Sequence, residues 1–344
     1  MKAVVYDAIG EQPVVREVPP PVCPADGVVV AVGATGVCRS DWHAWRGHDP
    51  VELPHIPGHE LAGRIVELGS AVRHFRVGDR VTVPFVCGCG VCETCLAGDA
   101  QVCPNQTQPG FTGPGSFAER VALHAADANL VALPDAVDFV TAASLGCRFA
   151  TAFRALTAHG RVGAGDWLAV YGCGGVGLSA VMIGVALGAH VVAVDISPAA
   201  LALAAELGAE ATVDSSLTDP AAAVRELTGG GAQVSLDALG SSQTAVASVR
   251  SLRRRGRHLQ VGLLLGDQAT PPLPMDLVLS RELELYGSHG MAAHEYPAML
   301  RLIESGALHP ERLVGSVIGL DDAPAALMAM DHPPTRPGLT VISL

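Results

Sequence analysis

Four closely spaced cysteines give the strongest chemical signal in the sequence. Cys89, Cys92, Cys95 and Cys103 are separated by two, two and seven residues, with glycines among them. Four thiolates at such short spacing can close a tetrahedral zinc site, and an iron–sulfur cluster or a redox-active pair are the alternatives. Zinc is favoured because nothing else in the sequence indicates electron transfer. Four thiolate ligands leave no open position, so we expect a structural site, with Cys87 as a spare thiol.

Three further potential metal ligands lie far apart in the sequence. Cys38, His59 and Cys147 are each weak evidence alone, because cysteine is commonly buried as a small hydrophobe and a single histidine is more often structural than a ligand. Their neighbours strengthen each candidate. The three segments read Cys38-Arg39-Ser40-Asp41-Trp42-His43, Gly58-His59-Glu60 and Gly146-Cys147-Arg148.

A glycine-rich turn follows an apolar strand and opens a helical segment, in the order Gly172-Cys173-Gly174-Gly175-Val176-Gly177. Gly172 permits a tight turn, Gly174 lets backbone amides approach a pyrophosphate, and Gly177 lets the helix pack closely on the strand. The helix N-terminus also favours phosphate binding. Asp195, eighteen positions after Gly177, ends the next strand, where its carboxylate can bind ribose hydroxyls and repel a 2′-phosphate. The pattern predicts a dinucleotide site that prefers NAD to NADP.

Two kinds of structure must position these residues. Up to about residue 150, short β-type runs broken by Gly, Pro and Asp, such as 28–32, 63–68 and 80–83, are typical of a barrel-like β domain. From about Thr151, apolar strands alternate with Ala-rich helices, which predicts an α/β region with a doubly wound parallel sheet. We expect strands at 167–171, 190–195, 211–214, 233–237, 258–261 and 283–286, and helices at 178–187 and 198–207.

The segment beyond about Gly290 predicts a discontinuous division of the chain. A helix at 295–304 and short strands near 314–318 and 340–343 can rejoin the first domain. We therefore expect a catalytic domain of residues 1–150 and 290–344, with a cysteine lobe at about 85–105, and an NAD-binding domain of residues 151–289. The run Arg253-Arg254-Arg255 is expected to be a solvated helix end.

Composition excludes some functions. The 344 residues are 49% hydrophobic and 16% charged with a net charge of −12, which argues against a general affinity for nucleic acid or anionic membranes. Residues 167–194 contain no Asp, Glu, Lys or Arg, but their glycines divide them into strand, turn, helix and strand rather than a membrane span. The first seven residues alternate like a strand and contain no signal peptide, which favours a cytoplasmic location.

In this combination the sequence resembles the zinc-containing alcohol dehydrogenases of the medium-chain dehydrogenase/reductase family. The resemblance covers essentially the whole chain and rests on the Gly58-His59-Glu60 triplet, the four-cysteine lobe, Cys147 before the nucleotide domain and the glycine-rich loop, all in the family's order. It implies a GroES-like catalytic domain interrupted by a Rossmann domain. It also implies two zinc ions per subunit, NAD, a small alcohol or carbonyl substrate and a homotetramer, or alternatively a homodimer.

The resemblance assigns the catalytic zinc ligands position by position. Cys38, His59 and Cys147 resemble the three protein ligands, which leave a fourth position for water or substrate. Glu60 resembles the carboxylate that can approach the metal during ligand exchange, and Asp41 resembles the acid that orients the histidine.

The resemblance also assigns residues around the metal. Ser40 occupies the position of the hydroxyl that accepts the alcohol proton, and His43 that of the imidazole that passes the proton towards solvent. Phe85 resembles an aromatic residue of the substrate pocket. The resemblance places Arg39 at the cofactor pyrophosphate. The remaining residues expected to bind the cofactor are Val176 in the loop, and Val261 and Gly262 at the end of the strand expected at 258–261.

One position departs from the family. Many members have a basic residue after a glycine near the C-terminus, whereas here Gly338 is followed by Leu339, and Arg336 is the candidate replacement. Five histidines have no ligand-like setting and are expected to be surface or structural residues, namely His48, His55, His74, His124 and His289.

An NAD-dependent oxidation of primary or secondary alcohols is therefore the leading prediction. A polyol or sugar dehydrogenase on the same scaffold is the alternative, although Phe85 and the scarcity of charge near the expected pocket favour simple or apolar alcohols. A non-catalytic zinc-binding or redox-sensing protein, or a zinc-free quinone reductase, is disfavoured because Cys38, His59 and Cys147 are all present.

Overall fold

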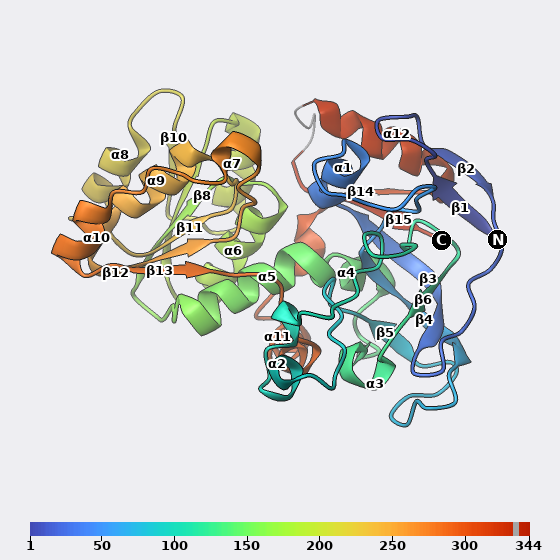
Figure 1. The fold of residues 1–344 in the computed structure, drawn as a ribbon. Coiled ribbons are helices and arrows are strands. Elements are labelled where there is room, and N and C mark those ends of the chain that lie inside the picture. Colours follow the sequence, from blue (N-terminus) through green and yellow to red (C-terminus); the bar gives the residue numbers. More distant parts are fainter. Residues whose placement is uncertain (333–336) are drawn as a thin grey trace.

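The computed structural model describes residues 1–332 and 337–344 and contains two large sheets, one in each half of the molecule (Figure 1). Arg336 lies outside the described residues. The first large sheet has six strands in the order β10-β9-β8-β11-β12-β13, and every neighbouring pair is parallel. Its strands are β8 (Trp167–Tyr171), β9 (His190–Asp195), β10 (Ala211–Asp214), β11 (Ala232–Asp237), β12 (Leu252–Gln260) and β13 (Glu284–Gly287).

Helices cover both faces of this sheet. Because side chains alternate along a strand, Leu168 and Val170 of β8 lie in one apolar cluster, whereas Ala169 and Tyr171 lie in another. The first cluster includes side chains of α5, α6 and α7, and the second includes side chains of α8 and α9. This doubly wound arrangement is the one predicted. The helices are α5 (Ala150–Arg154), α6 (Gly175–Ala186), α7 (Pro198–Glu206), α8 (Pro220–Leu227), α9 (Ser242–Arg250) and α10 (Met275–Arg281).

The second large sheet joins segments from both ends of the sequence. Its order is β14-β15-β3-β4-β5-β7, and β6 also pairs with β3. β15 runs antiparallel to β3, with Thr340 opposite Val37, so that a strand beyond residue 330 completes a sheet begun before residue 40. The strands are β3 (Val28–Val37), β4 (Glu60–Leu68), β5 (Arg80–Thr82), β6 (Arg120–Leu123), β7 (Val131–Ala132), β14 (Val314–Ile318) and β15 (Leu339–Ser343).

Short elements surround this second sheet. β1 (Lys2–Val5) and β2 (Val14–Glu17) form a separate antiparallel pair. The helices are α1 (Arg39–Trp45), α2 (Glu93–Leu96), α3 (Ala126–Asn129), α4 (Phe139–Ala143), α11 (Tyr296–Glu304) and α12 (Ala323–Met328). Among the described residues, no helix is both long enough and apolar enough to cross a bilayer.

Most predicted elements match the structure within two or three residues, and one expectation is wrong. Arg253, Arg254 and Arg255 do not end a helix, because α9 stops at Arg250 and β12 begins at Leu252. The three arginines are exposed, as expected, but they lie in the first half of a strand that is longer than predicted. The pairing of β11 with β12 is irregular between Ala232 and Val234, and Arg255 has a φ of +60°. This half of β12 is therefore an irregular strand, and its exposed arginines do not show the apolar pattern of a buried strand.

Candidate active site and structural metal centre

Four side chains from three distant segments converge at one buried point. One ligand atom from each of Cys38, His59, Glu60 and Cys147 lies within 4.8 Å of the others. Cys38 caps the N-terminus of α1, His59 directly precedes β4, and Cys147 lies in the π-helical turn Leu145–Phe149. Such π-helical turns are rare and are often found at functional sites.

Asp41 ties two of these segments together. One carboxylate oxygen, Oδ2, accepts the backbone N–H of Cys38 at 3.0 Å, which caps α1. The other, Oδ1, accepts the backbone N–H of Gly58 at 3.0 Å and lies 2.8 Å from Nδ1 of His59. Asp41 and His59 are both fully buried. The carboxylate is therefore placed to hold the imidazole in one orientation.

The donor set fits a zinc ion. Nδ1 of His59 donates to Asp41, so Nε2 of the neutral ring carries no hydrogen. Nε2 is buried, yet it has no hydrogen-bond partner among the described residues. A buried acceptor without a partner is costly unless it binds a ligand. The Cys147 thiol, followed by the charge of Arg148, lowers the pKa of Cys38 well below its usual value despite burial, which favours the thiolate. Two sulfurs and one imidazole nitrogen match a zinc site with an open position.

The π-helical turn that carries Cys147 is held by two side chains. Tyr296 of α11 is fully buried and its hydroxyl donates to the carbonyl of Gly146 at 3.2 Å. Thr151 Oγ1 donates to the carbonyl of Cys147 at 2.6 Å. The Gly146 carbonyl also accepts the backbone N–H of Phe85 at 3.4 Å, and the Cys147 carbonyl accepts that of Ala150, so the two side chains add bonds to carbonyls that the backbone already uses.

Glu60 forms a buried ion pair that sequence reasoning missed. Its Oε2 binds Nη2 of Arg148, and its Oε1 accepts Nε of Arg148 at 3.1 Å and the backbone N–H of Cys147 at 3.2 Å. Nη1 of Arg148 donates to the Val37 carbonyl at 3.2 Å. Burial alone would lower the pKa of Arg148, but the Glu60 carboxylate outweighs burial and raises it. The adjacency of Arg148 to Cys147 was visible in the sequence, but its partner was not.

Aromatic rings border the metal-ligand cluster. The ring of Phe85 lies 6.1 Å from that of His59, and the ring of Phe111 lies 5.2 Å from it, both edge-on. His289, expected to be a surface or structural residue, packs edge-on against Phe85 at 5.1 Å. Phe111 and His289 were missed because neither belongs to a motif with a characteristic spacing.

The polar residues of α1 lie beside the same cluster. The thiol of Cys38 is 3.9 Å from the hydroxyl oxygen of Ser40. Arg39 donates to the carbonyl of Met330 at 2.5 Å and its guanidinium lies 4.7 Å from the centre of the Trp42 ring. Nδ1 of His43 lies 3.0 Å from Nδ1 of His48, a residue that the sequence had not linked to the site.

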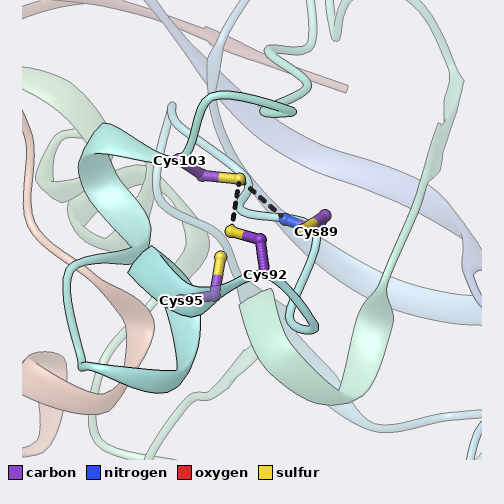
Figure 2. Close-up of side chains that lie close together, drawn as sticks. All are labelled: Cys89, Cys92, Cys95 and Cys103. Carbon is purple, nitrogen blue, oxygen red and sulfur yellow. Dashed lines mark hydrogen bonds between the residues drawn. The ribbon is translucent and has the colours of Figure 1, made fainter.

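The four cysteines of the lobe face one another, as Figure 2 shows. Their sulfur atoms all lie within 4.8 Å of one another, and those of Cys92 and Cys103 are 3.6 Å apart. The Cys103 sulfur accepts the backbone N–H groups of Cys89 at 3.4 Å and Asn105 at 3.3 Å, a contact that stabilises a thiolate. Backbone N–H groups of Val91 and then Cys92 lower the pKa of Cys89 to about 6. The cluster therefore fits a closed tetrahedral zinc site.

The glycine-rich loop connects β8 to α6 in the six-stranded sheet. Gly172 has a left-handed φ of +91°, and a Cβ on Gly177 would collide with the carbonyl oxygen of Gly172. Around Gly174, in contrast, an added Cβ would meet no atom within 4 Å, so backbone amides are open to a ligand there. A Cβ on Gly175 would meet Arg148 and Leu339, which places both side chains beside the loop.

The other predicted cofactor residues lie at the carboxyl ends of neighbouring strands. Asp195, at the end of β9, accepts the backbone N–H groups of Cys173 at 2.6 Å and Ser197 at 2.8 Å and is half-buried. Val261 and Gly262 follow β12, and their N–H groups donate to the Asp237 carbonyl at 3.1 and 2.8 Å. Ligands of doubly wound sheets bind at this edge.

Comparisons with known proteins agree with this geometry. Residues 24–135 match the alcohol dehydrogenase GroES-like domain family, and residues 175–305 match the zinc-binding dehydrogenase family. An alcohol dehydrogenase of Geobacillus stearothermophilus is 38% identical over 266 residues, which cover 76% of this chain and 78% of the relative. Solved structures of dehydrogenases resemble the chain over its full length.

One of them, the alcohol dehydrogenase TADH from Thermus sp. ATN1, has a TM-score of 0.92 and 29% identity, with 99% of its own chain covered. Another, an NAD-dependent alcohol dehydrogenase, has a TM-score of 0.89 and 30% identity, with 100% of its chain covered. These matches confirm a GroES-like domain combined with a Rossmann-type parallel sheet. The chain belongs to the zinc-containing alcohol dehydrogenases of the medium-chain dehydrogenase/reductase family.

Proposed function

We propose that the chain oxidises a primary or secondary alcohol to an aldehyde or ketone with NAD, at a zinc ion held by Cys38, His59 and Cys147. The observation that carries the proposal is the convergence of these three residues, with a buried Nε2 of His59 that no other described residue satisfies. A closed structural site would need a fourth strong ligand, but the fourth side chain of the cluster, Glu60, is engaged by Arg148.

The residues around the metal would each contribute to the reaction. Zinc held by these residues would supply a Lewis acid that lowers the pKa of a bound hydroxyl group. Ser40 would take up the alcohol proton and His43 would pass it on, and bound NAD would supply the acceptor for the hydride of the carbon. Asp41 holds His59 in the ligating tautomer. The rings of Phe85 and Phe111 help to exclude water from the reacting carbon.

Cofactor binding would use the edge formed by the glycine-rich loop. Gly172, Gly174, Gly175, Val176 and Gly177 present backbone amides to the pyrophosphate, and the open side of Gly174 supports this assignment. Asp195 would bind the adenosine ribose, since each oxygen retains lone pairs after its one backbone contact. Arg39, Val261 and Gly262 would complete the binding surface. The Asp195 carboxylate would repel a 2′-phosphate, which favours NAD.

The substrate class follows from the side chains beside the cluster. Phe85 and Phe111 present apolar edges near His59, and such a wall offers no hydrogen bonds to several hydroxyl groups. This favours simple or apolar alcohols over polyols and sugars. A polyol dehydrogenase would instead show a higher kcat/KM for a sugar alcohol than for a monohydric alcohol of equal length.

Domain division, assembly and location are also part of the proposal. Residues 1–150 and 290–344 would form the catalytic domain and residues 151–289 the NAD-binding domain.

A homotetramer or homodimer is supported by β13, which pairs only with β12 among the described residues, and by exposed Met275 and Leu279 on α10 beside it. Sites that need free thiolates favour the reducing cytoplasm.

The test combines metal content with activity. Plasma mass spectrometry of fresh protein should give two zinc ions per subunit, and a panel of alcohols should produce NADH with NAD. One zinc, lost when Cys92 is changed to Ala, would leave the Cys38 site without metal and contradict the proposal. Absence of NADH formation with any alcohol would favour a non-catalytic zinc-binding or redox-sensing role.

A further inference from the structure

We propose that His48 extends the proton relay, by accepting the proton of His43 through a direct imidazole contact and releasing it to solvent. This inference rests on the proposed function, in which His43 receives the alcohol proton. The two Nδ1 atoms are 3.0 Å apart, which is a hydrogen-bond distance. The ring of His43 is half-buried, and its Nδ1 contacts the exposed ring of His48. A proton on His43 can therefore pass to His48 before it reaches solvent.

The contact is produced by the way α1 ends. The backbone N–H of His48 donates to the His43 carbonyl at 2.9 Å, and that of Gly47 donates to the Ala44 carbonyl at 3.0 Å. Gly47 has a left-handed φ of +76°. These two bonds and the glycine define a Schellman cap, in which the second residue after the cap packs against the residue three positions before it. Here those two residues are His48 and His43, so the cap itself brings the rings together.

The residues around His43 and His48 favour proton transfer between the two rings over a purely structural contact at the helix cap. The Trp42 ring lies 5.0 Å from the His43 ring and 5.4 Å from the His48 ring, and it packs edge-on against both. Burial, followed by the charges of His48 and Arg39, lowers the pKa of His43, so the ring is neutral and able to accept a proton near neutral pH. His48 is exposed, so a proton that reaches it meets water.

The charged groups around the pair do not block this route. Arg39 on α1 lies over the ring of Trp42. Cys38, at the start of the same helix, raises the pKa of His43 and so opposes the lowering by burial, His48 and Arg39. Asp331, from the turn Ala329–Asp331, accepts Nε1 of Trp42 at 2.8 Å and pairs with Arg46. Oδ1 of Asp331 also accepts Nε of Arg46 at 2.9 Å, so both carboxylate oxygens are engaged, and neither imidazole bonds to Asp331 among the described residues.

The proton count of the step is balanced. At 3.0 Å one Nδ1 must donate and the other accept, so the neutral rings hold opposite tautomers. When His43 gains a proton at Nε2, its Nδ1 proton passes to Nδ1 of His48, and His48 loses its Nε2 proton to water. One proton enters at His43 and one leaves at His48, and neither ring changes its net charge. His48 does not touch substrate or cofactor, so it is a positioning residue that acts through His43.

The test separates proton release from hydride transfer in His48→Gln. Stopped-flow measurements would follow NADH absorbance and, with a pH indicator in weakly buffered solution, the released proton. We expect hydride transfer in the first turnover to remain close to the wild-type rate and proton release to slow about tenfold, less than the 10²–10⁴-fold of direct acid–base catalysis because water partly replaces the imidazole. Free imidazole in the buffer should restore proton release in the variant and have little effect on the wild type.

Two further variants keep the result interpretable. His309→Gln alters another exposed histidine, one that contacts Glu311 at 3.0 Å, and should behave like the wild type. Gly47→Ala keeps both imidazoles but strains the cap, since its Cβ would lie 2.8 Å from Ile9, and it should slow proton release in the same way as His48→Gln. Equal proton release in His48→Gln and wild type, with no response to imidazole, would overturn the inference. If wild type itself forms no NADH, the proposed function fails instead.

Discussion

Replacing Arg148 with Met is expected to destabilise the fold more than any other single change of a charged residue discussed above. Arg148 and Glu60 are both buried and bind each other through both carboxylate oxygens. Removal of one partner leaves an uncompensated charge in the interior, which costs roughly 3–5 kcal/mol in other proteins. Methionine keeps most of the volume of the side chain, so loss of packing adds little.

The structure favours the lower end of this range. After the change, Oε1 of Glu60 would keep the backbone N–H groups of Cys147 at 3.2 Å and Arg148 at 3.1 Å. The Val37 carbonyl would lose its bond to Nη1, which adds a part of the cost of an unsatisfied buried acceptor. We therefore expect a loss of about 3 kcal/mol, or roughly a hundredfold in the folding equilibrium.

Urea unfolding followed by tryptophan fluorescence would measure this loss. Glu60→Gln combined with Arg148→Met removes both charges, and the double variant should recover about half of the loss or more. Arg154→Met is the matched control, because Arg154 binds Glu295 at 3.2 Å where the carboxylate is partly exposed, and it should cost about 1 kcal/mol or less. If Arg148→Met lay within about 0.5 kcal/mol of wild type at unchanged m-value, the buried pair would not have the energetic role assigned to it.

Three further predictions concern the reaction. Cys38→Ala or His59→Ala should lose one zinc per subunit and most turnover while the lobe zinc remains, and a normal rate in either variant would contradict the ligand assignment; Cys103→Ala, in contrast, should lose the lobe zinc. Asp195→Ala should reduce the preference for NAD, so that the ratio of kcat/KM with NAD to that with NADP falls, and an unchanged ratio would place the ribose elsewhere. His43→Gln should slow alcohol oxidation most at low pH, where proton release is hardest, because the lowered pKa of His43 keeps the wild-type ring neutral well into that range; a pH–rate profile parallel to that of wild type would refute the relay.

Local patterns were sufficient to predict the parallel sheet. β8, β9 and β10 have the predicted bounds, because their apolar runs are bounded by glycine or by the N-caps of helices. The loop between β8 and α6 was predictable for a similar reason, since Gly172 has a left-handed φ and a Cβ on Gly177 would collide with the Gly172 carbonyl oxygen, so other residues would not fit at these two positions. The first half of β12 was not, because exposed arginines give no strand pattern.

The metal-ligand cluster could be predicted only in part. Cys38, His59 and Cys147 were identified through the resemblance of their segments to a family, not through any spacing that brings them together. Their neighbour Arg148 was missed as a functional residue because its partner is 88 positions away, and no local rule links the two. The His43–His48 contact is different, since a glycine one position before the second histidine was a readable sign of a helix cap.

The pairing of β15 with β3 has a consequence for the order in which the chain folds during synthesis. Ala34, Thr35 and Gly36 pair on one side with β4 and on the other with β15, which is translated about 300 residues later. Until then this half of β3 presents an unpaired edge, and the ribosome has already released every strand of the six-stranded sheet. The half of the molecule that is encoded second is therefore expected to be the first to complete its fold, and the exposed β3 edge is where a nascent chain would need protection from aggregation.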